Sequence, residues 1–84
     1  MDYIKVGKIS HYFDKIGVAA LEISGEALKV GDKIRVGEQD DGFEQTVVSM
    51  QADHEVVEVA KIGQDVGLKV DQQVKANSNV YLVK

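Results

Sequence analysis

The sequence of 84 residues contains no cysteine, no proline and no tryptophan. Without cysteine there is no disulfide, no thiolate nucleophile and no metal site built on cysteine. Basic charge is also scarce, because 10 Lys and Arg stand against 14 Asp and Glu and leave a net charge of −4. This balance argues against a protein that binds nucleic acid by neutralising phosphates with clustered Lys and Arg.

Long apolar runs are missing too. No stretch approaches the roughly 18 apolar residues that a membrane-spanning helix requires. Lys5 and Lys8 interrupt the N-terminal segment, and no apolar region typical of a secretory signal follows them. We therefore expect a cytoplasmic protein with no membrane partner.

The apolar residues that are present are mostly branched at Cβ, with 14 Val and 6 Ile against 4 Leu. Branching at Cβ restricts the χ1 angle, disfavours helix and suits the pleated surface of a sheet. Glycine must form the turns, since proline is absent. A small chain without disulfide or metal needs a well-closed core, and closing a sheet on itself removes its exposed edges. The composition predicts one all-β domain over residues 1–84 with a closed or nearly closed sheet.

Short stretches of alternating apolar and polar residues, separated by turn residues, predict about seven strands. Residues 65–70 alternate most cleanly, and a loss of phase beside Gly7 predicts a bulge in the first strand. No internal repeat is evident. The predicted strands are residues 3–12, 18–24, 33–36, 43–51, 54–59, 65–70 and 80–83.

Acidic charge is concentrated in residues 36–60, which hold seven carboxylates and no Lys or Arg. The stretch is typical of a solvated face. The alternative is a surface that repels RNA and leaves a milder basic side for a partner. The carboxylates are Glu38, Asp40, Asp41, Glu44, Asp53, Glu55 and Glu58.

Reactive groups are few. Asp53 and His54 are neighbours in a predicted strand and point to opposite faces, so they cannot easily share a metal ion. Ser10 beside His11 lacks the separate third group of a catalytic triad. We expect that the chain is not an enzyme. We also expect that it uses no metal or cofactor and binds no nucleotide by itself.

The best candidate binding surface is the predicted turn after the first strand, His11-Tyr12-Phe13-Asp14-Lys15, with Lys8 nearby. Exposed aromatic rings beside Lys stack on bases or anchor in a protein pocket. Alternatively, Tyr12 or Phe13 folds back and plugs the end of the barrel.

The order of several short motifs resembles domain 2 of the translational GTPases such as elongation factor Tu. It is also similar to the C-terminal barrel of the collagenase-like peptidases, several of which act in RNA modification. The motifs are Val6-Gly7-Lys8-Ile9, Gly17-Val18-Ala19, residues 28–34, residues 46–50, residues 57–60 and residues 63–68.

This resemblance implies a small closed Greek-key β-barrel of about six to seven strands. It implies a non-catalytic binding module that engages a protein or RNA of the translation or RNA-modification machinery. The alternative is a protein-interaction adaptor with no nucleic-acid role. The candidate binding residues are Lys8, His11, Tyr12, Phe13, Lys15, Gln51, His54 and Lys69. The positions expected to shape turns or allow close approach are Gly7, Gly17, Gly31, Asp32, Gly63 and Gly67.

Overall fold

The computed structural model describes residues 3–37, 42–53 and 55–83, and within these ranges it contains ten strands and no helix. The predicted all-β fold is confirmed. No helix able to span a membrane occurs in the described part of the chain. The strands are β1 Tyr3–Phe13, β2 Val18–Ile23, β3 Leu28–Lys29, β4 Lys33–Val36, β5 Phe43–Thr46, β6 Met50–Ala52, β7 Glu55–Val57, β8 Val59–Ala60, β9 Asp65–Lys69 and β10 Asn79–Val83.

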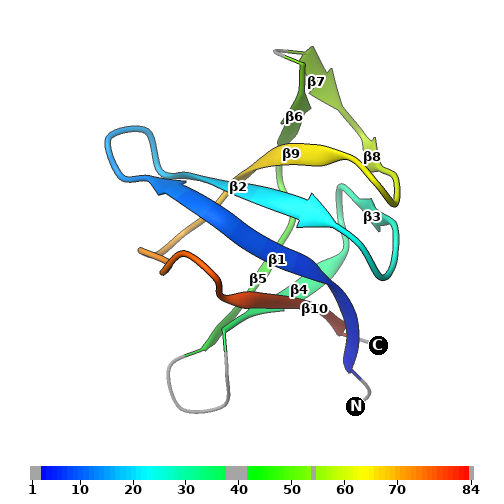
Figure 1. Cartoon of the computed structure of the whole chain (residues 1–84), viewed down its shortest axis with the longest axis horizontal. Coiled ribbons are helices and arrows are strands. Elements are labelled where there is room, and N and C mark those ends of the chain that lie inside the picture. Colours follow the sequence, from blue (N-terminus) through cyan, green and yellow to red (C-terminus); the bar gives the residue numbers. More distant parts are fainter. Residues whose placement is uncertain (1–2, 38–41, 54, 84) are drawn as a thin grey trace.

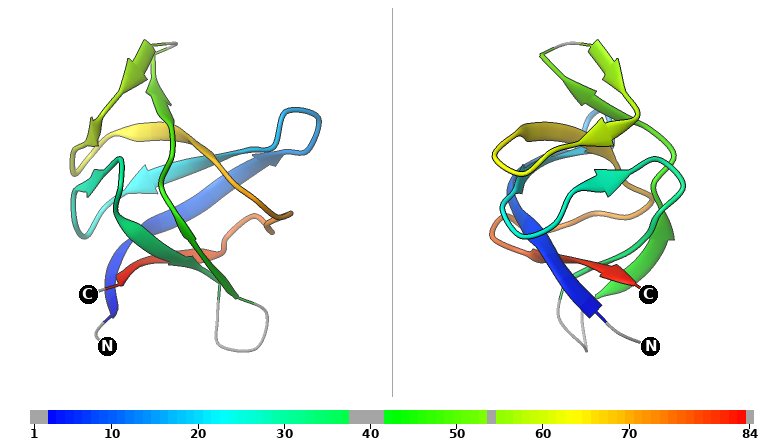
Figure 2. Two further views of the ribbon diagram at one scale, coloured as in Figure 1. Left: turned by 180° about the vertical axis from the view of Figure 1, so that it is seen from behind. Right: turned by 90° about the vertical axis from the view of Figure 1, so that its right-hand side faces the viewer.

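Eight strands form one strongly curled sheet in the order β5-β4-β10-β1-β2-β9-β6-β7, and β3 pairs with β8 (Figure 1). The chain runs from β5, the first strand in this order, into β6, the last but one (Figure 2). The sheet therefore curls back toward its first strand as an incompletely closed barrel, in which no ladder between described residues pairs β5 with β6 or β7. All pairings within it are antiparallel.

The barrel interior is filled by apolar side chains that alternate along the strands with exposed ones. Within β2 and β9 the inward side chains are those that the alternation predicts. The buried apolar residues are Val6, Ile9, Ala19, Leu21, Ile23, Leu28, Ile34, Val36, Val47, Met50, Ala60, Val66, Leu68, Val70, Val74, Val80 and Leu82.

Two of the predicted strands are interrupted. The stretch 43–51 is divided into β5 and β6, and 54–59 is divided into β7 and β8. The first break occurs because Val47 leaves the ladder with β4: its N–H donates to the Asp32 carbonyl, and its carbonyl accepts from Gly31, both at 2.8 Å. The Val47 side chain is buried in the core.

β1 contains two bulges. Its register with β10 shifts between Lys5 and Gly7, and its register with β2 shifts between Ile9 and His11. The first shift confirms the bulge predicted beside Gly7. The first extra residue changes the phase of the strand, so that Val6 and Ile9 both point into the core. The second changes it again after Ile9, so that Tyr12 packs against the core.

Two turns of the barrel have the same construction. In each, the N–H of the fourth residue donates to the carbonyl of a lysine, and the side-chain oxygen of the fourth residue accepts a hydrogen bond from the N–H of the same lysine. The bonds are 3.0 and 2.9 Å between Asp32 and Lys29, and 3.1 and 2.8 Å between Gln64 and Lys61. The third residue is glycine in both turns, and its positive φ, 98° at Gly31 and 94° at Gly63, is a conformation that side chains disfavour.

The surroundings of the two turns match as well. Gly31 and Asp32 bond to Val47, as Gly63 and Gln64 bond to Ile23, at 2.8 to 2.9 Å. The strands before the two turns, β3 and β8, pair with each other. The sheet order divides accordingly into two equivalent halves, β5-β4-β10-β1 and β2-β9-β6-β7.

The two turns are thus equivalent in structure, although the sequence shows no evident internal repeat. Residues 28–36 and 60–68 have the same pattern of apolar positions, but only one lysine and one glycine are identical between them. The repeat is visible in the hydrogen bonds and the strand order, and barely visible in the sequence.

Candidate functional site

The β1–β2 hairpin places aromatic side chains on both faces of its tip. His11 and Phe13 share one face, where their ring centroids lie 4.5 Å apart in an edge-to-face arrangement. Phe13 is 46% exposed. Tyr12 points to the other face and packs, half-buried, against the core. Of the two alternatives for these rings, Tyr12 therefore covers the barrel and Phe13 stays accessible.

The turn of this hairpin is held by backbone bonds and by one lysine. Ile16 and Gly17 donate to the Phe13 carbonyl at 3.2 and 3.0 Å, and Gly17 takes a φ of 66°. Lys69 Nζ, on the neighbouring strand β9, donates to the Ile16 carbonyl at 3.3 Å. The Ile16 side chain is left 61% exposed. A shallow hollow of about 220 Å³, lined by residues 11–16, lies beside it.

The structure thus brings five predicted binding residues to one hairpin: His11, Tyr12, Phe13, Lys15 and Lys69. We call the exposed part of this surface, formed by His11, Phe13, Lys15 and Ile16, the hairpin tip. It carries two accessible apolar side chains, Phe13 and Ile16, beside a lysine and a histidine.

The other predicted binding residues are not part of the hairpin tip. Lys8 lies in the body of β1, opposite Glu22. Gln51 is exposed on β6, opposite Val56 and beside Gly67 of β9. His54 lies outside the described residues.

The glycines singled out from the sequence occupy two kinds of position. Gly17, Gly31 and Gly63 lie in turns with positive φ. Gly7 and Gly67 lie inside β1 and β9 and belong to no turn. A Cβ on Gly7 would overlap the Glu22 carbonyl, and a Cβ on Gly67 would lie 3.2 Å from Val18 Cγ1.

A second exposed surface, which we call the acidic edge, lies on and beside β7 and is formed by Asp53, Glu55, Val56 and Glu58. Val56 is 75% and Val48 61% exposed. The sequence signals only its charge. The exposed valines were not predicted, because an apolar residue in a strand is expected to point inward until the paired strands are known.

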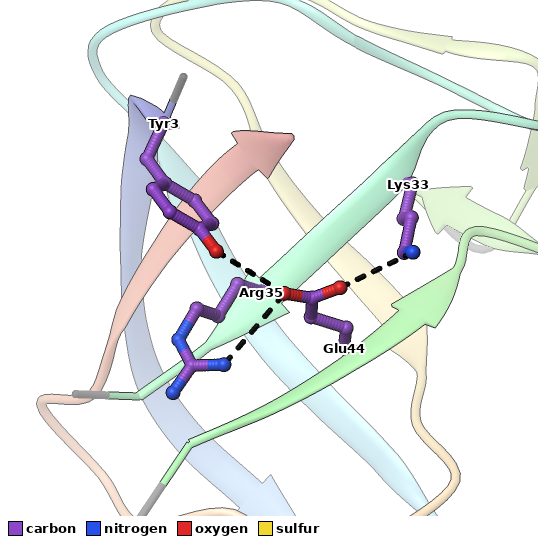
Figure 3. A network of polar contacts seen from close by, with 4 residues as sticks. All are labelled: Tyr3, Lys33, Arg35 and Glu44. Carbon is purple, nitrogen blue, oxygen red and sulfur yellow. Dashed lines mark hydrogen bonds and ion pairs between the residues drawn. The ribbon is translucent and has the colours of Figure 1, made fainter. Parts of the chain in front are cut away.

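Charged groups also gather across β1, β4 and β5 (Figure 3). The Glu44 carboxylate lies 3.2 Å from Lys33 Nζ and 3.8 Å from Arg35, and it accepts a bond from the Tyr3 hydroxyl at 3.3 Å. The hydrogen bond from Lys33 is the main cause that lowers the pKa of Glu44, and desolvation opposes it in part. This network ties three strands together on the outer surface, and no chemistry is implied by it.

Within the described ranges, no group of three or more His, Cys, Asp or Glu side chains is placed to hold a metal ion. A hollow of about 290 Å³ lies between the β4–β5 pair and residues 73–79, and it is lined by Phe43, Val74 and several amide side chains. Its lining offers apolar and amide groups, and no cluster of titratable side chains.

No family model matches the chain. It is 38% identical over 82 residues to an uncharacterized protease of Methanocaldococcus jannaschii, a match that covers 96% of this chain and 20% of that protein. It is 33% identical over 79 residues to a collagenase of Porphyromonas gingivalis, covering 93% of this chain and 19% of that protein. In sequence, the chain is similar to one segment of collagenase-like peptidases.

A solved structure has the same fold. The C-terminal domain of a Geobacillus thermoleovorans protein named as a U32 peptidase superposes with a TM-score of 0.84, over 94% of this chain and 91% of that domain, at 15% identity. The likeness concerns the fold alone. It agrees with the collagenase-like part of the resemblance, whereas the resemblance to elongation factor Tu is not shown.

The comparisons correct the functional prediction. The relatives are named as proteases and collagenases. The prediction of a translation-factor-like binding module is therefore wrong. The chain spans about a fifth of the length of the curated relatives that it matches.

Proposed function

We propose that this chain is an accessory, non-catalytic domain of a collagenase-like peptidase. The observation that carries the proposal is the pattern of coverage: the match takes in nearly all of this chain and only 20% of the M. jannaschii protease. Four fifths of that protein lie outside the matched segment and have room for the catalytic groups. The partner that we propose is a polypeptide, which replaces the expected protein or RNA of the translation machinery. We also propose a cytoplasmic location.

The hairpin tip is the surface that we assign to contact with the catalytic region. Phe13 and Ile16 are exposed apolar side chains on a turn that Lys69 anchors. Large apolar side chains on a rigid element give much of the binding energy of protein interfaces, because little conformational freedom is lost when they are covered.

A chimera tests both statements. The matched segment of the P. gingivalis collagenase is deleted or replaced by this chain, and hydrolysis of gelatin is measured for each protein and for this chain alone. We expect no hydrolysis by the chain alone, loss of activity on deletion and recovery in the chimera. The double change Phe13→Ser and Ile16→Ser should abolish the recovery, whereas Ile62→Ser, at a site 60% exposed, should not.

Two results would contradict the proposal. Hydrolysis of gelatin by the chain alone would show that it is catalytic itself. Full activity of the deleted protein would show that the domain has no role in the reaction. Full activity of the chimera with both serine changes would remove the hairpin tip as the contact surface and leave the accessory role standing.

A further inference from the structure

β7 is an open edge of the sheet. β7 is the counterpart of β1 in the two equivalent halves. β1 is the fourth strand of the half β5-β4-β10-β1, and β7 is the fourth strand of the half β2-β9-β6-β7. β1 pairs on both sides, with β10 and with β2. Among the residues that the structure describes, β7 pairs with β6 alone and is the last strand in the order. No described strand lies beside β7 in the position that β2 fills beside β1.

The side chains at this edge leave one apolar group open to solvent. Edge strands are commonly kept short and charged, and β7 follows this rule in part, with three residues and a glutamate at its start. It has no lysine, and it carries Val56, which is 75% exposed, between Glu55 and Val57.

The charge at the edge has one sign. Asp53, Glu55 and Glu58 are exposed. No ion pair joins any of the three to another described residue, and no Lys or Arg occurs between positions 36 and 60 of the chain. Lys61 follows β8 in the chain, and Lys29 lies opposite Val59 on β3. A partner that covers this edge is therefore complementary when it is basic.

We propose that β7 binds an extended basic polypeptide segment as an added strand. Main-chain hydrogen bonds to β7 hold the segment, as in other cases of strand addition. An apolar residue opposite Val56 packs on it, and its two neighbours then point to the other face, where Glu55 attracts a lysine or arginine. The segment recognised has basic and apolar residues in alternation.

This inference deepens the proposed accessory role and rests on it only for the source of the segment, a protein substrate of the peptidase. Strand addition suits that role, because main-chain hydrogen bonds supply affinity for an extended segment while Val56 and Glu55 favour apolar and basic residues in it. Binding by the edge is a property of the chain alone, so it is tested without any peptidase.

The probe is a short fluorescein-labelled peptide of alternating Lys and Val with blocked ends. Its binding is measured by fluorescence anisotropy and mapped with backbone amide shifts of the labelled protein. Three peptides serve as comparisons: alternating Glu and Val, alternating Lys and Ser, and the Lys–Val peptide N-methylated at alternate residues. We expect the Lys–Val peptide to change the backbone amide shifts of residues 50–53 and 55–58. Each comparison peptide should bind at least about tenfold more weakly.

Variants locate the site. Val56→Ser, and separately the pair Glu55→Lys and Glu58→Lys, should each weaken binding of the Lys–Val peptide about tenfold. The matched controls are Ile62→Ser, at a site 60% exposed outside both proposed surfaces, and Glu22→Lys, on an exposed position of β2. Neither control should change the affinity. Amide spectra of all variants verify that the fold is kept.

Three outcomes would overturn the inference: equal binding of the Glu–Val peptide, shifts confined to residues outside β6 and β7, or equal loss in the controls. Sedimentation that shows a dimer disrupted by Val56→Ser would assign the edge to a second copy of the chain instead. Failure of the chimera with intact peptide binding would reject the accessory role alone, so the two proposals fail separately.

Discussion

Gln45 and Leu21 occupy equivalent positions in the two halves of the barrel. Gln45 lies opposite Ile34 of β4, and Leu21 lies opposite Val66 of β9. Both side chains are buried. Gln45 is polar where its counterpart is apolar because its amide donates to the Lys69 carbonyl and accepts from the Asp71 N–H, each at 2.8 Å. One side chain thereby joins β5 to the chain that leaves β9 and helps to close the barrel.

Replacing Gln45 by leucine tests this closure. Gln45→Leu keeps a similar volume but leaves the Lys69 carbonyl and the Asp71 N–H without their partner. We expect the free energy of unfolding to fall by about 1–2 kcal/mol, the usual cost of leaving such groups unpaired. Urea unfolding measures the change. Gln72→Leu, at an exposed position, is the control and should change it little. A Gln45→Leu protein as stable as the parent would show that the side chain does not close the barrel.

The two equivalent turns should respond alike to the loss of glycine. A Cβ at Gly31 or Gly63 meets no atom within 4 Å, so the cost of alanine comes from the backbone conformation alone. We expect Gly31→Ala and Gly63→Ala each to lower the free energy of unfolding by about 1–3 kcal/mol. Asparagine should cost less, since it tolerates positive φ better than alanine. A large cost at one turn and none at the other would argue against their equivalence.

Gly7 should be far less tolerant than Gly67. A Cβ at Gly7 would overlap the Glu22 carbonyl across the β1–β2 pair, where neither backbone can move without breaking the ladder. At Gly67 the nearest atom is Val18 Cγ1, 3.2 Å away, which can move with its side chain. We expect Gly7→Ala to cost about 1–3 kcal/mol or more and Gly67→Ala less than about 1 kcal/mol. Thermal unfolding of both variants gives the comparison, and equal costs would contradict it.

The Glu44 network predicts a dependence of stability on pH. Because the pKa of Glu44 is lower in the folded protein than in the unfolded chain, the folded state favours the ionised carboxylate. The contribution is complete above the ordinary pKa range of glutamate and is lost as the pH falls through the lowered pKa. A carbon-detected NMR titration should place the midpoint of Glu44 below the ordinary pKa of a glutamate side chain. Lys33→Met should raise that midpoint and reduce the loss of stability in acid, whereas Lys75→Met should leave both unchanged.

Much of the barrel follows from local patterns. The alternation in residues 18–24 and 65–70 predicts β2 and β9 and their inward side chains, because in a strand successive side chains point to opposite faces. The same rule places His11 and Phe13 on one face of the hairpin tip. The contact of Lys69 with Ile16 could not be predicted, since it depends on β9 lying beside β2. The break at Val47 depends likewise on a turn at Gly31, which is remote in the sequence.

Composition and alternation were sufficient to establish an all-β barrel without disulfides, because branched apolar residues, glycine turns and a period of two act within a few residues of chain. Pairing across the sheet acts between distant residues and was decided only when the chain folded. It made two halves equivalent that share hardly any sequence, and it paired β1 on both sides while leaving β7 paired on one. A strand edge becomes available for binding only through the neighbour that it lacks, and no local pattern of residues records that neighbour.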